Sequence, residues 1–376
     1  MSKKDVVVVG GGGAGTMFVK EFLRKFDRTR YTLTLVNSRP VYIYLPTTVR
    51  MAVTDHGHLE DIVCMPYDRL LGDAGKLVVG TVESIDEKAS GQGGHVVLRD
   101  GTRLHYDALV LAPGTRLENP LDYPDTREDI QKYVDEWRQK VKDAEHIVFS
   151  GGGPTSVELA GEIKEYFPEK QTTIVQSRSL PFNNVYRDNF RRRILKECET
   201  SGIKFVFNDY LDEAVPKDGY VTTRKGETVR ADLVMTSHGG RPATEFMKSL
   251  GENVLTKYGL VPTNPTLELP DHPGIFCIGD VLDNTERNRL GKYVKHVNAV
   301  VPNVLARLNG KEPKKKYTGS IETIAISIGS ERGVSYIGIL WGICIGSWLT
   351  RLTQSKHLAI QAGRWVMGYG WTTGKA

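Results

Sequence analysis

Glycines at a characteristic spacing follow the first apolar run of this sequence. Four valines at 6–9 lead into a glycine turn, after which phenylalanines recur at every fourth position, as on one face of a helix. A strand, a tight turn and a helix start in this order are typical of a dinucleotide-binding turn, which holds a pyrophosphate on backbone N–H groups. A glycine turn without a ligand is the alternative. The residues expected to contact the ligand are Gly10, Gly12, Gly13, Ala14 and Gly15.

The same arrangement occurs a second time. An apolar run at 146–150 leads into Gly151 and Gly153, and a helical pattern follows, with Ser156 in the place of the third glycine. Glu158 falls in the first turn of this helix, where a negative charge is favoured in any case. Two such units arise together by chance far less often than one, so the sequence predicts an internal duplication of a nucleotide-binding unit.

The residue that ends the second strand of each unit bears on nucleotide choice. In the first unit this residue is Asn37, where an acid normally holds a ribose hydroxyl pair, and its amide accepts a hydrogen bond without charge assistance. Because the cation of Arg39 lies close by in the sequence, binding of a phosphate at the end of this strand stays open as an alternative. In the second unit the strand ends at Gln176, which is uncharged, and Arg178 close by provides a cation where an acid would favour NADH. We therefore expect NADPH to be accepted, with the use of NADH left open.

Two further strand ends are candidates for ligand contact. A strand-like run at 107–111 closes on a turn of small residues, which are Ala112, Pro113, Gly114 and Thr115. A late apolar strand ends on Gly279 and Asp280. The Asp280 carboxylate can accept a hydrogen bond from a sugar hydroxyl or cap a turn, and both roles stay open.

The composition fits a soluble globular protein of more than one domain. The chain has 376 residues, of which 40% are hydrophobic and 25% charged. Its cysteines are scattered, with neither a C-x-x-C pair nor metal-ligand spacing, which indicates a reducing compartment, no disulfide framework and no metal site. They are Cys64, Cys198, Cys277 and Cys344. We expect no signal peptide and no lipid attachment, because no such motif stands at either end.

The C-terminal region is basic. No acidic residue follows Glu331, and an uncharged apolar stretch at 333–350 lies between Arg332 and Arg351. Such a region suits an anionic surface, either lipid headgroups or nucleic acid, and its aromatic content favours peripheral contact with a membrane. A solvated basic face and an ordinary packed subdomain are the alternatives.

The local pattern of this region predicts a small α+β unit. Strands at 323–328 and 334–339 would form a hairpin around the turn at 329–333. A helix would follow, with one side formed by Trp341, Ile345, Trp348 and Leu352.

The motifs together resemble those of flavoproteins with two dinucleotide-binding domains, the FAD-dependent pyridine nucleotide oxidoreductase superfamily. Within it the chain resembles the apoptosis-inducing-factor-related branch, close to ferroptosis-suppressor-like flavoproteins, and more distantly the single-subunit NADH:quinone dehydrogenases. The connection at 42–46 and the tail at 350–356 fit that branch. The resemblance covers nearly the whole chain.

The resemblance implies an α/β fold with a glutathione-reductase-like arrangement of two Rossmann-like domains. Residues 1–116 and 252–309 would form the FAD-binding domain and 117–251 the NAD(P)H-binding domain. Residues 310–376 would form the C-terminal α+β domain.

Roles for the site residues follow from the same resemblance. The first glycine turn would hold the FAD pyrophosphate, with Asn37 near the adenosine ribose and the turn at 112–115 along the flavin. Gly279 and Asp280 would hold the ribityl or pyrophosphate part. The second turn, with Gly151, Gly153 and Ser156, would receive the NAD(P)H pyrophosphate.

Two side chains are candidates for a direct part in the reaction. Glu158 would lie near the nicotinamide and the isoalloxazine, and we hypothesise that it pairs with Arg50, which would also contact the cofactor. The helix after Asp280 would direct its positive end at the flavin, and His296 could add to that charge. A structural role for His296 is the alternative.

These residues predict an enzyme that passes a hydride from NAD(P)H to FAD. No cysteine pair could relay electrons as a dithiol, so the electrons of the reduced flavin must pass to a diffusible acceptor or to a protein. Of these acceptors, the resemblance favours a quinone. The alternatives are reduction of a small electron-transfer protein, or a signalling flavoprotein whose basic surface binds nucleic acid or a protein. We expect a cytoplasmic location. Peripheral attachment to a membrane, either a lipid droplet or the mitochondrial outer surface, stays open, as does the oligomeric state.

Overall fold

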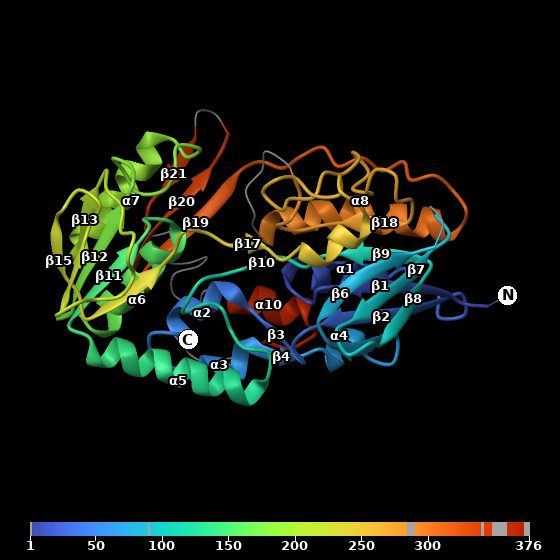
Figure 1. Cartoon of the computed structure of the whole chain (residues 1–376), viewed down its shortest axis with the longest axis horizontal. Coiled ribbons are helices and arrows are strands. Elements are labelled where there is room, and N and C mark those ends of the chain that lie inside the picture. Colours follow the sequence, from blue (N-terminus) through green and yellow to red (C-terminus); the bar gives the residue numbers. More distant parts are fainter. Residues whose placement is uncertain (1, 89–90, 284–289, 340–341, 348–358, 372–376) are drawn as a thin grey trace.

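The structure is a computed structural model that describes residues 2–88, 91–283, 290–339, 342–347 and 359–371. Two α/β units lie side by side, and the C-terminal region contacts both of them (Figure 1). This architecture confirms the predicted α/β class with two sheets of parallel strands.

The first unit is built on a five-stranded parallel sheet of order β18-β9-β1-β2-β5. Its strands are β1 (Lys4–Val9), β2 (Tyr31–Asn37), β5 (Lys76–Val79), β9 (Ala108–Leu111) and β18 (Ile275–Cys277). The four valines of β1 are at most 5% exposed, as expected for a central parallel strand that is covered on both faces. Helices α1 (Gly13–Leu23) and α8 (Leu290–Leu308) pack against each other in this unit.

The second unit repeats this plan with a four-stranded parallel sheet of order β13-β12-β11-β16. Its strands are β11 (His146–Ser150), β12 (Gln171–Gln176), β13 (Ile203–Phe207) and β16 (Leu233–Thr236). Its helices are α5 (Arg127–Asp143), α6 (Pro154–Tyr166) and α7 (Asp188–Thr200).

The repeat extends to individual hydrogen bonds. The N–H of Gly10 donates to the carbonyl of Val36 at 2.8 Å, and the N–H of Gly151 donates to the carbonyl of Val175 at 2.9 Å. Both glycines have a positive φ, of 100° and 101° respectively. The two glycine turns are therefore held to the neighbouring strand in the same way.

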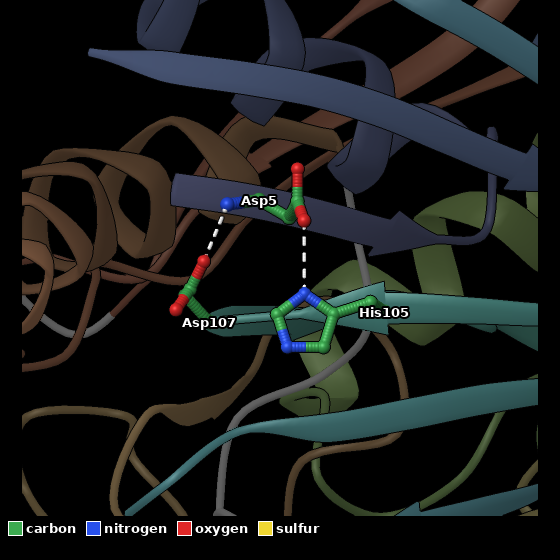
Figure 2. A group of neighbouring side chains, drawn as sticks. All are labelled: Asp5, His105 and Asp107. Atoms are coloured by element: carbon green, nitrogen blue, oxygen red, sulfur yellow. Dashed lines mark hydrogen bonds and ion pairs between the residues drawn. The ribbon is translucent and has the colours of Figure 1, made fainter. Parts of the chain in front are cut away.

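An aspartate holds the start of the central strand in each unit. Asp107 accepts the N–H of Asp5 at 2.6 Å, and Asp232 accepts the N–H of His146 at 2.8 Å. His105 adds a 2.8 Å contact to the Asp5 carboxylate, so that three possible metal ligands lie together (Figure 2). Because each of the three already makes a hydrogen bond at the start of β1, the pairing of β1 with its neighbouring segments accounts for the cluster.

Smaller antiparallel sheets complete the two units. They comprise β3 (Val41–Ile43) with β4 (Cys64–Pro66); β6 (Val82–Glu87), β7 (Gly94–Leu98) and β8 (Arg103–Tyr106); and β14 (Tyr220–Thr222) with β15 (Thr228–Arg230). Short helices are α2 (Leu45–Met51), α3 (Leu59–Val63), α4 (Asp68–Leu71) and the 3-10 helix η1 (Glu245–Leu250).

A two-stranded ribbon joins the units where the chain crosses between them. It consists of β10 (Thr115–Arg116) and β17 (Arg241–Pro242), which run antiparallel. The N–H of Ala243 also donates to the carbonyl of Gly114 at 2.9 Å. The outgoing and the returning crossings are thus hydrogen-bonded to each other.

The C-terminal region lies over both units. The sheet of β19 (Thr323–Ile328), β20 (Arg332–Ile337) and β21 (Ile343–Ile345) packs on α6 and α7, and α10 (Ile360–Val366) packs on α1 and α3. The contact with α6 is close, because a Cβ added to Gly161 would lie 2.6 Å from the Cα of Ile328.

The predicted hairpin is confirmed by the antiparallel pairing of β19 with β20. The helix predicted from Trp341 onward is wrong at Ile345, which lies in β21 and pairs with Ser335 of β20. Gly342 at φ +88° starts a new extended segment there, in which isoleucines alternate. Trp341, Trp348, Arg351 and Leu352 lie outside the described residues.

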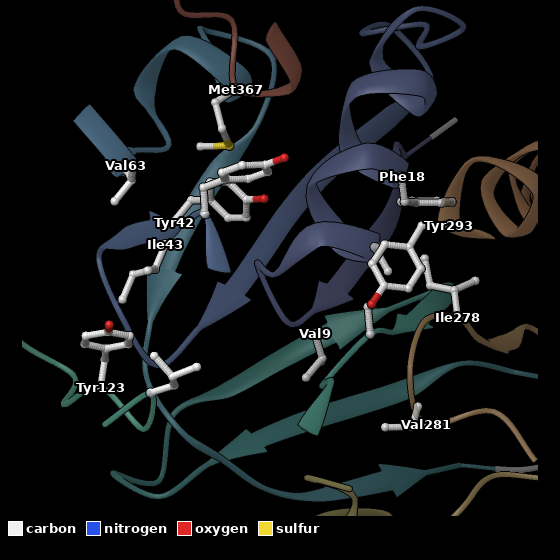
Figure 3. Close-up of a cluster of buried hydrophobic side chains, with 14 of the residues drawn as sticks. Val9, Phe18, Tyr42, Ile43, Val63, Tyr123, Ile278, Val281, Tyr293 and Met367 are labelled. Atoms are coloured by element: carbon white, nitrogen blue, oxygen red, sulfur yellow. The ribbon is translucent and has the colours of Figure 1, made fainter. Parts of the chain in front are cut away.

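One large buried cluster runs through both units and into the C-terminal region. Figure 3 shows part of it in the first unit, where Tyr42 of β3, Val9 of β1 and Tyr293 of α8 gather around the end of the sheet. Met367, just after α10, joins the same cluster. Among the described residues, no helix combines the length and the apolarity that a bilayer crossing requires.

Candidate active site

The first cavity, of about 310 Å³, lies at the carboxyl ends of the strands of the first sheet. It brings together residues that the sequence places more than 250 positions apart. The predicted residues that line it are Gly10, Gly12, Gly13, Ala14, Asn37, Ala112, Pro113, Gly114, Thr115, Gly279 and Asp280.

The glycines of the first turn differ in what surrounds them. A Cβ on Gly10 would lie 2.1 Å from the carbonyl oxygen of Ala112, and a Cβ on Gly15 would lie 1.9 Å from that of Gly10. A Cβ on Gly12 would meet no atom within 4 Å. Gly10 and Gly15 therefore permit close backbone packing, whereas Gly12 faces open space at the N-terminus of α1, which no side chain caps. This cradle fits a pyrophosphate.

Asn37 lines this cavity but already has hydrogen bonds at both ends of its amide. Its Oδ1 accepts the N–H of Gly11 at 2.9 Å, and its Nδ2 donates to the carbonyl of Arg39 at 2.9 Å. The guanidinium of Arg39 donates to the carbonyls of Pro124, at 2.9 Å, and of Tyr123. These bonds engage Arg39 with the protein and argue against a phosphate at this end.

Asp280 follows β18, which lies on the other side of β1 from β2 and Asn37. Its Oδ1 accepts a short hydrogen bond from the hydroxyl of Tyr293 on α8, and burial raises the pKa of Asp280 above its usual range. Tyr293 also lines the cavity, although the sequence analysis did not select it. Buried His296 accepts the N–H of Gly279 at 3.3 Å on Nδ1 and packs edge-on against Tyr317, which supports its structural role.

The second cavity, of about 250 Å³, occupies the equivalent place in the second unit. Of the predicted residues, Gly151, Gly153 and Arg178 line it. Arg178 is exposed, and among the described residues its guanidinium makes no hydrogen bond or ion pair. Ser156 is fully buried in α6 and does not line the cavity, so it serves packing in the place of the third glycine.

His238 is a further residue at this cavity that the sequence analysis missed. Its Nε2 lies 2.8 Å from the hydroxyl of Ser150, the last residue of β11. Its backbone N–H donates to Glu118 Oε2 at 2.8 Å, just beyond the ribbon between the units. Only the pairing of two distant segments brings these groups together, so the sequence offers no signal for them.

Comparison with known proteins identifies the family. The profile of the pyridine nucleotide-disulphide oxidoreductases matches residues 4–300. The chain belongs to this family. It is 39% identical over 320 residues to the FAD-dependent oxidoreductase FVFD30 of Flammulina velutipes, covering 85% of this chain and 99% of that one. It is therefore an FAD-dependent oxidoreductase that uses a pyridine nucleotide.

More distant relatives agree with the branch that the motifs indicated. Apoptosis-inducing factor homolog B of Dictyostelium discoideum is 28% identical over 385 residues, covering 95% of each chain. Ferroptosis suppressor protein 1 of Taeniopygia guttata is 26% identical, covering 96% of this chain and 95% of that one. The sulfide:quinone oxidoreductase of Aquifex aeolicus has the same fold, with a TM-score of 0.76 at 18% identity over 97% of this chain and 91% of that one.

The predicted pair of Arg50 and Glu158 is wrong. Arg50 of α2 is buried and pairs with Glu162 of α6, one helical turn beyond Glu158, with Nε–Oε2 and Nη2–Oε1 distances of 2.7 and 3.1 Å. Glu158 instead accepts from the N–H and the hydroxyl of Ser327 on β19, both at 3.4 Å. Neither Arg50 nor Glu158 lines either cavity. The acids at 158 and 162 share one helix face, so the sequence could not distinguish them.

The cysteines do not form the redox pair to which the family name refers. All four are free, and three of them are buried. Burial raises the pKa of Cys64 to about 11 and also raises the pKa of Cys198 and of Cys277. None of the four lines either cavity. This chain therefore lacks a thiolate beside the cofactor sites that could exchange with a disulfide.

We expect single substitutions at the Arg50–Glu162 pair to be strongly destabilising. Arg50→Met or Glu162→Gln breaks the buried ion pair and removes the counterion of the remaining charge, which costs about 3–5 kcal/mol of unfolding free energy. The double variant Arg50→Met/Glu162→Met should cost less than the sum of the single changes. Denaturant unfolding measures all of these changes. Arg24→Met, which breaks an exposed pair with Glu21, is the control, and single changes at the buried pair that cost no more than this control would contradict the prediction.

We expect the cysteines to react slowly in the native protein. At pH 8 a thiol with a pKa near 11 is almost entirely protonated and, when buried, out of reach. A thiol reagent such as DTNB should modify at most the half-buried Cys344 in the folded protein and all four thiols after denaturation. Two thiols that become reactive on addition of NAD(P)H would contradict this expectation, because they would reveal a dithiol relay.

Proposed function

We propose that this protein transfers electrons from NAD(P)H to a quinone-type acceptor. When bound, the flavin supplies the chemistry of accepting a hydride and releasing its electrons. The main support is the lack of a redox-active thiol pair at the cavities, since the electrons must then leave for an external acceptor. The fold shared with a sulfide:quinone oxidoreductase and the relationship to ferroptosis suppressor protein 1 are consistent with a quinone.

The residues of the two cavities would bind and orient the cofactors. The turn at Gly10–Gly12 would hold the FAD pyrophosphate on backbone N–H groups, and Asp280 would accept hydrogen bonds from FAD. The turn at Gly151–Gly153 would hold the NAD(P)H pyrophosphate in the same way. The β10–β17 ribbon runs between the cavities, with Thr115 at the first and His238 just before β17 at the second. A fixed ribbon would maintain the alignment that hydride transfer requires.

Arg178 would favour NADPH over NADH. It is exposed at the second cavity, close to the end of β12, where the 2′-phosphate of NADPH would be bound. The neighbouring Gln176 is buried, and its amide donates to the carbonyls of Leu180 and Phe182 at 3.2 and 3.1 Å, so it is engaged with the protein. Asp209 lines the cavity as well, but its carboxylate accepts the backbone N–H groups of Tyr210 and Lys225.

We expect Arg178→Ala to raise the KM for NADPH by about 10- to 100-fold, the effect of losing a charge-assisted phosphate contact. The KM for NADH should change little. Steady-state assays with ferricyanide as acceptor measure both values without involving the quinone. Arg192→Ala, an exposed change on α7, is the matched control. Equal changes in the two KM values would refute a phosphate contact.

The proposed acceptor is tested with the purified flavoprotein under exclusion of oxygen. We expect saturable reduction of a short-chain quinone, with one NAD(P)H consumed per quinone because both are two-electron carriers. Reduction of ferricyanide reports separately on electron delivery to the flavin. Efficient reduction of ferricyanide and of a small iron–sulfur protein, without saturable reduction of the quinone, would contradict the quinone proposal. It would favour a small electron-transfer protein as the acceptor.

A further inference from the structure

The carboxylate that is missing at the end of β2 has a substitute in another segment. We propose that Asp125 binds the ribose hydroxyls of the FAD adenosine, in place of the acid that a dinucleotide-binding unit normally carries where this chain has Asn37. Asp125 precedes α5 and belongs to the segment that leads from the ribbon into the second unit.

Asn37 is poorly suited to this role because of its hydrogen bonds. Its Oδ1 holds the N–H of Gly11 and its Nδ2 holds the carbonyl of Arg39. A ribose diol at this place needs an acceptor, and a carboxylate is a stronger acceptor than an amide oxygen that is already engaged. The chain therefore uses Asn37 to fix the glycine turn and requires a different group for the sugar.

Asp125 meets this need in position and in free acceptor capacity. It lines the first cavity together with Asn37, Ser38 and Arg39, the residues at the end of β2. Its Oδ1 accepts the hydroxyl of Ser38 at 2.8 Å and lies 3.6 Å from Nε of Arg39. Its Oδ2 has no hydrogen bond among the described residues, and its side chain is 54% exposed. One oxygen thus fixes the carboxylate and the other remains for a ligand.

The segment that carries Asp125 is anchored by the protein itself. Arg39 donates to the carbonyls of Pro124 and Tyr123, and the Tyr123 side chain is buried with its hydroxyl 3.4 Å from the carbonyl of Thr48. Thr126 then caps α5 by accepting the N–H of Asp129 at 3.1 Å. These contacts fix the backbone on both sides of Asp125, so its carboxylate is positioned without help from a ligand.

Asp122 provides a matched comparison. It lines the same cavity from the same segment and is exposed, but it makes no hydrogen bond among the described residues. Among the described residues it makes no hydrogen bond or ion pair with Asn37, Ser38 or Arg39 at the end of β2, whereas Asp125 bonds to Ser38 directly. If any nearby negative charge sufficed, substitution of either residue would have the same effect.

The test measures binding of FAD and FMN to the apoprotein by fluorescence titration. Asp125→Asn should raise the Kd for FAD by about 10- to 100-fold and leave the Kd for FMN unchanged, because FMN has no adenosine. Asp122→Asn should change neither value. Equal weakening of FAD and FMN by Asp125→Asn, or equal weakening of FAD by both substitutions, would overturn the proposal.

A second measurement changes the ligand, so that its first arm needs only the wild-type protein. The wild-type apoprotein should bind FAD that lacks the 2′-hydroxyl of its adenosine about tenfold or more weakly than FAD. Asp125→Asn should bind the two forms with similar affinity, since its contact to the sugar is already weakened. A wild-type protein that does not distinguish the two forms would show that Asp125 makes no ribose contact. Neither result depends on which acceptor the reduced enzyme uses.

Discussion

The approach of one backbone to another at the glycine turns is the constraint on which the rest of this structure depends. Gly10 lies against the carbonyl of Ala112, and Gly151 lies against the carbonyl of Ser237, where an added Cβ would be only 2.1 and 2.5 Å away. Each contact brings the loop after the fourth strand of a parallel sheet, counted along the chain, against the loop after its first strand. Both cavities form at these junctions, and the ribbon between the units continues directly from them.

The sequence predicts this constraint well because it is local. The residue types at fixed spacing already indicate it. They include a glycine where the turn needs a positive φ, a glycine where the helix must pack closely on the strand, and a run of valines typical of a buried strand. Residues of the first cavity that end or follow a strand, such as Ala112 and Asp280, could be found in the same way. Their position depends only on strand order, which the repeated motif implies.

The groups that were missed or misassigned depend on contacts between distant segments. Glu158 and Glu162 occupy the same face of α6, and only the packing of α2 decides which of them meets Arg50. Ile345 suits a helix by spacing but joins a strand because β20 offers an edge. Tyr293, His238 and Asp125 reach the cavities from a later helix or from the crossings between units, for which residue spacing gives no signal.

The buried ion pair limits how independent the two halves can be. Arg50 comes from the first unit and Glu162 from the second, and Arg138 of α5 likewise binds Glu60 of α3, at 2.6 and 3.1 Å, and the carbonyl of Met51. Although each half has its own sheet and its own glycine turn, neither is a closed module. A chimaera that exchanged the second half for that of a relative, with cuts only at the ribbon, would leave an arginine or a glutamate in the interior without its counterion. Recombination within this fold would therefore have to transfer matched helices across the seam, or replace both members of each pair together.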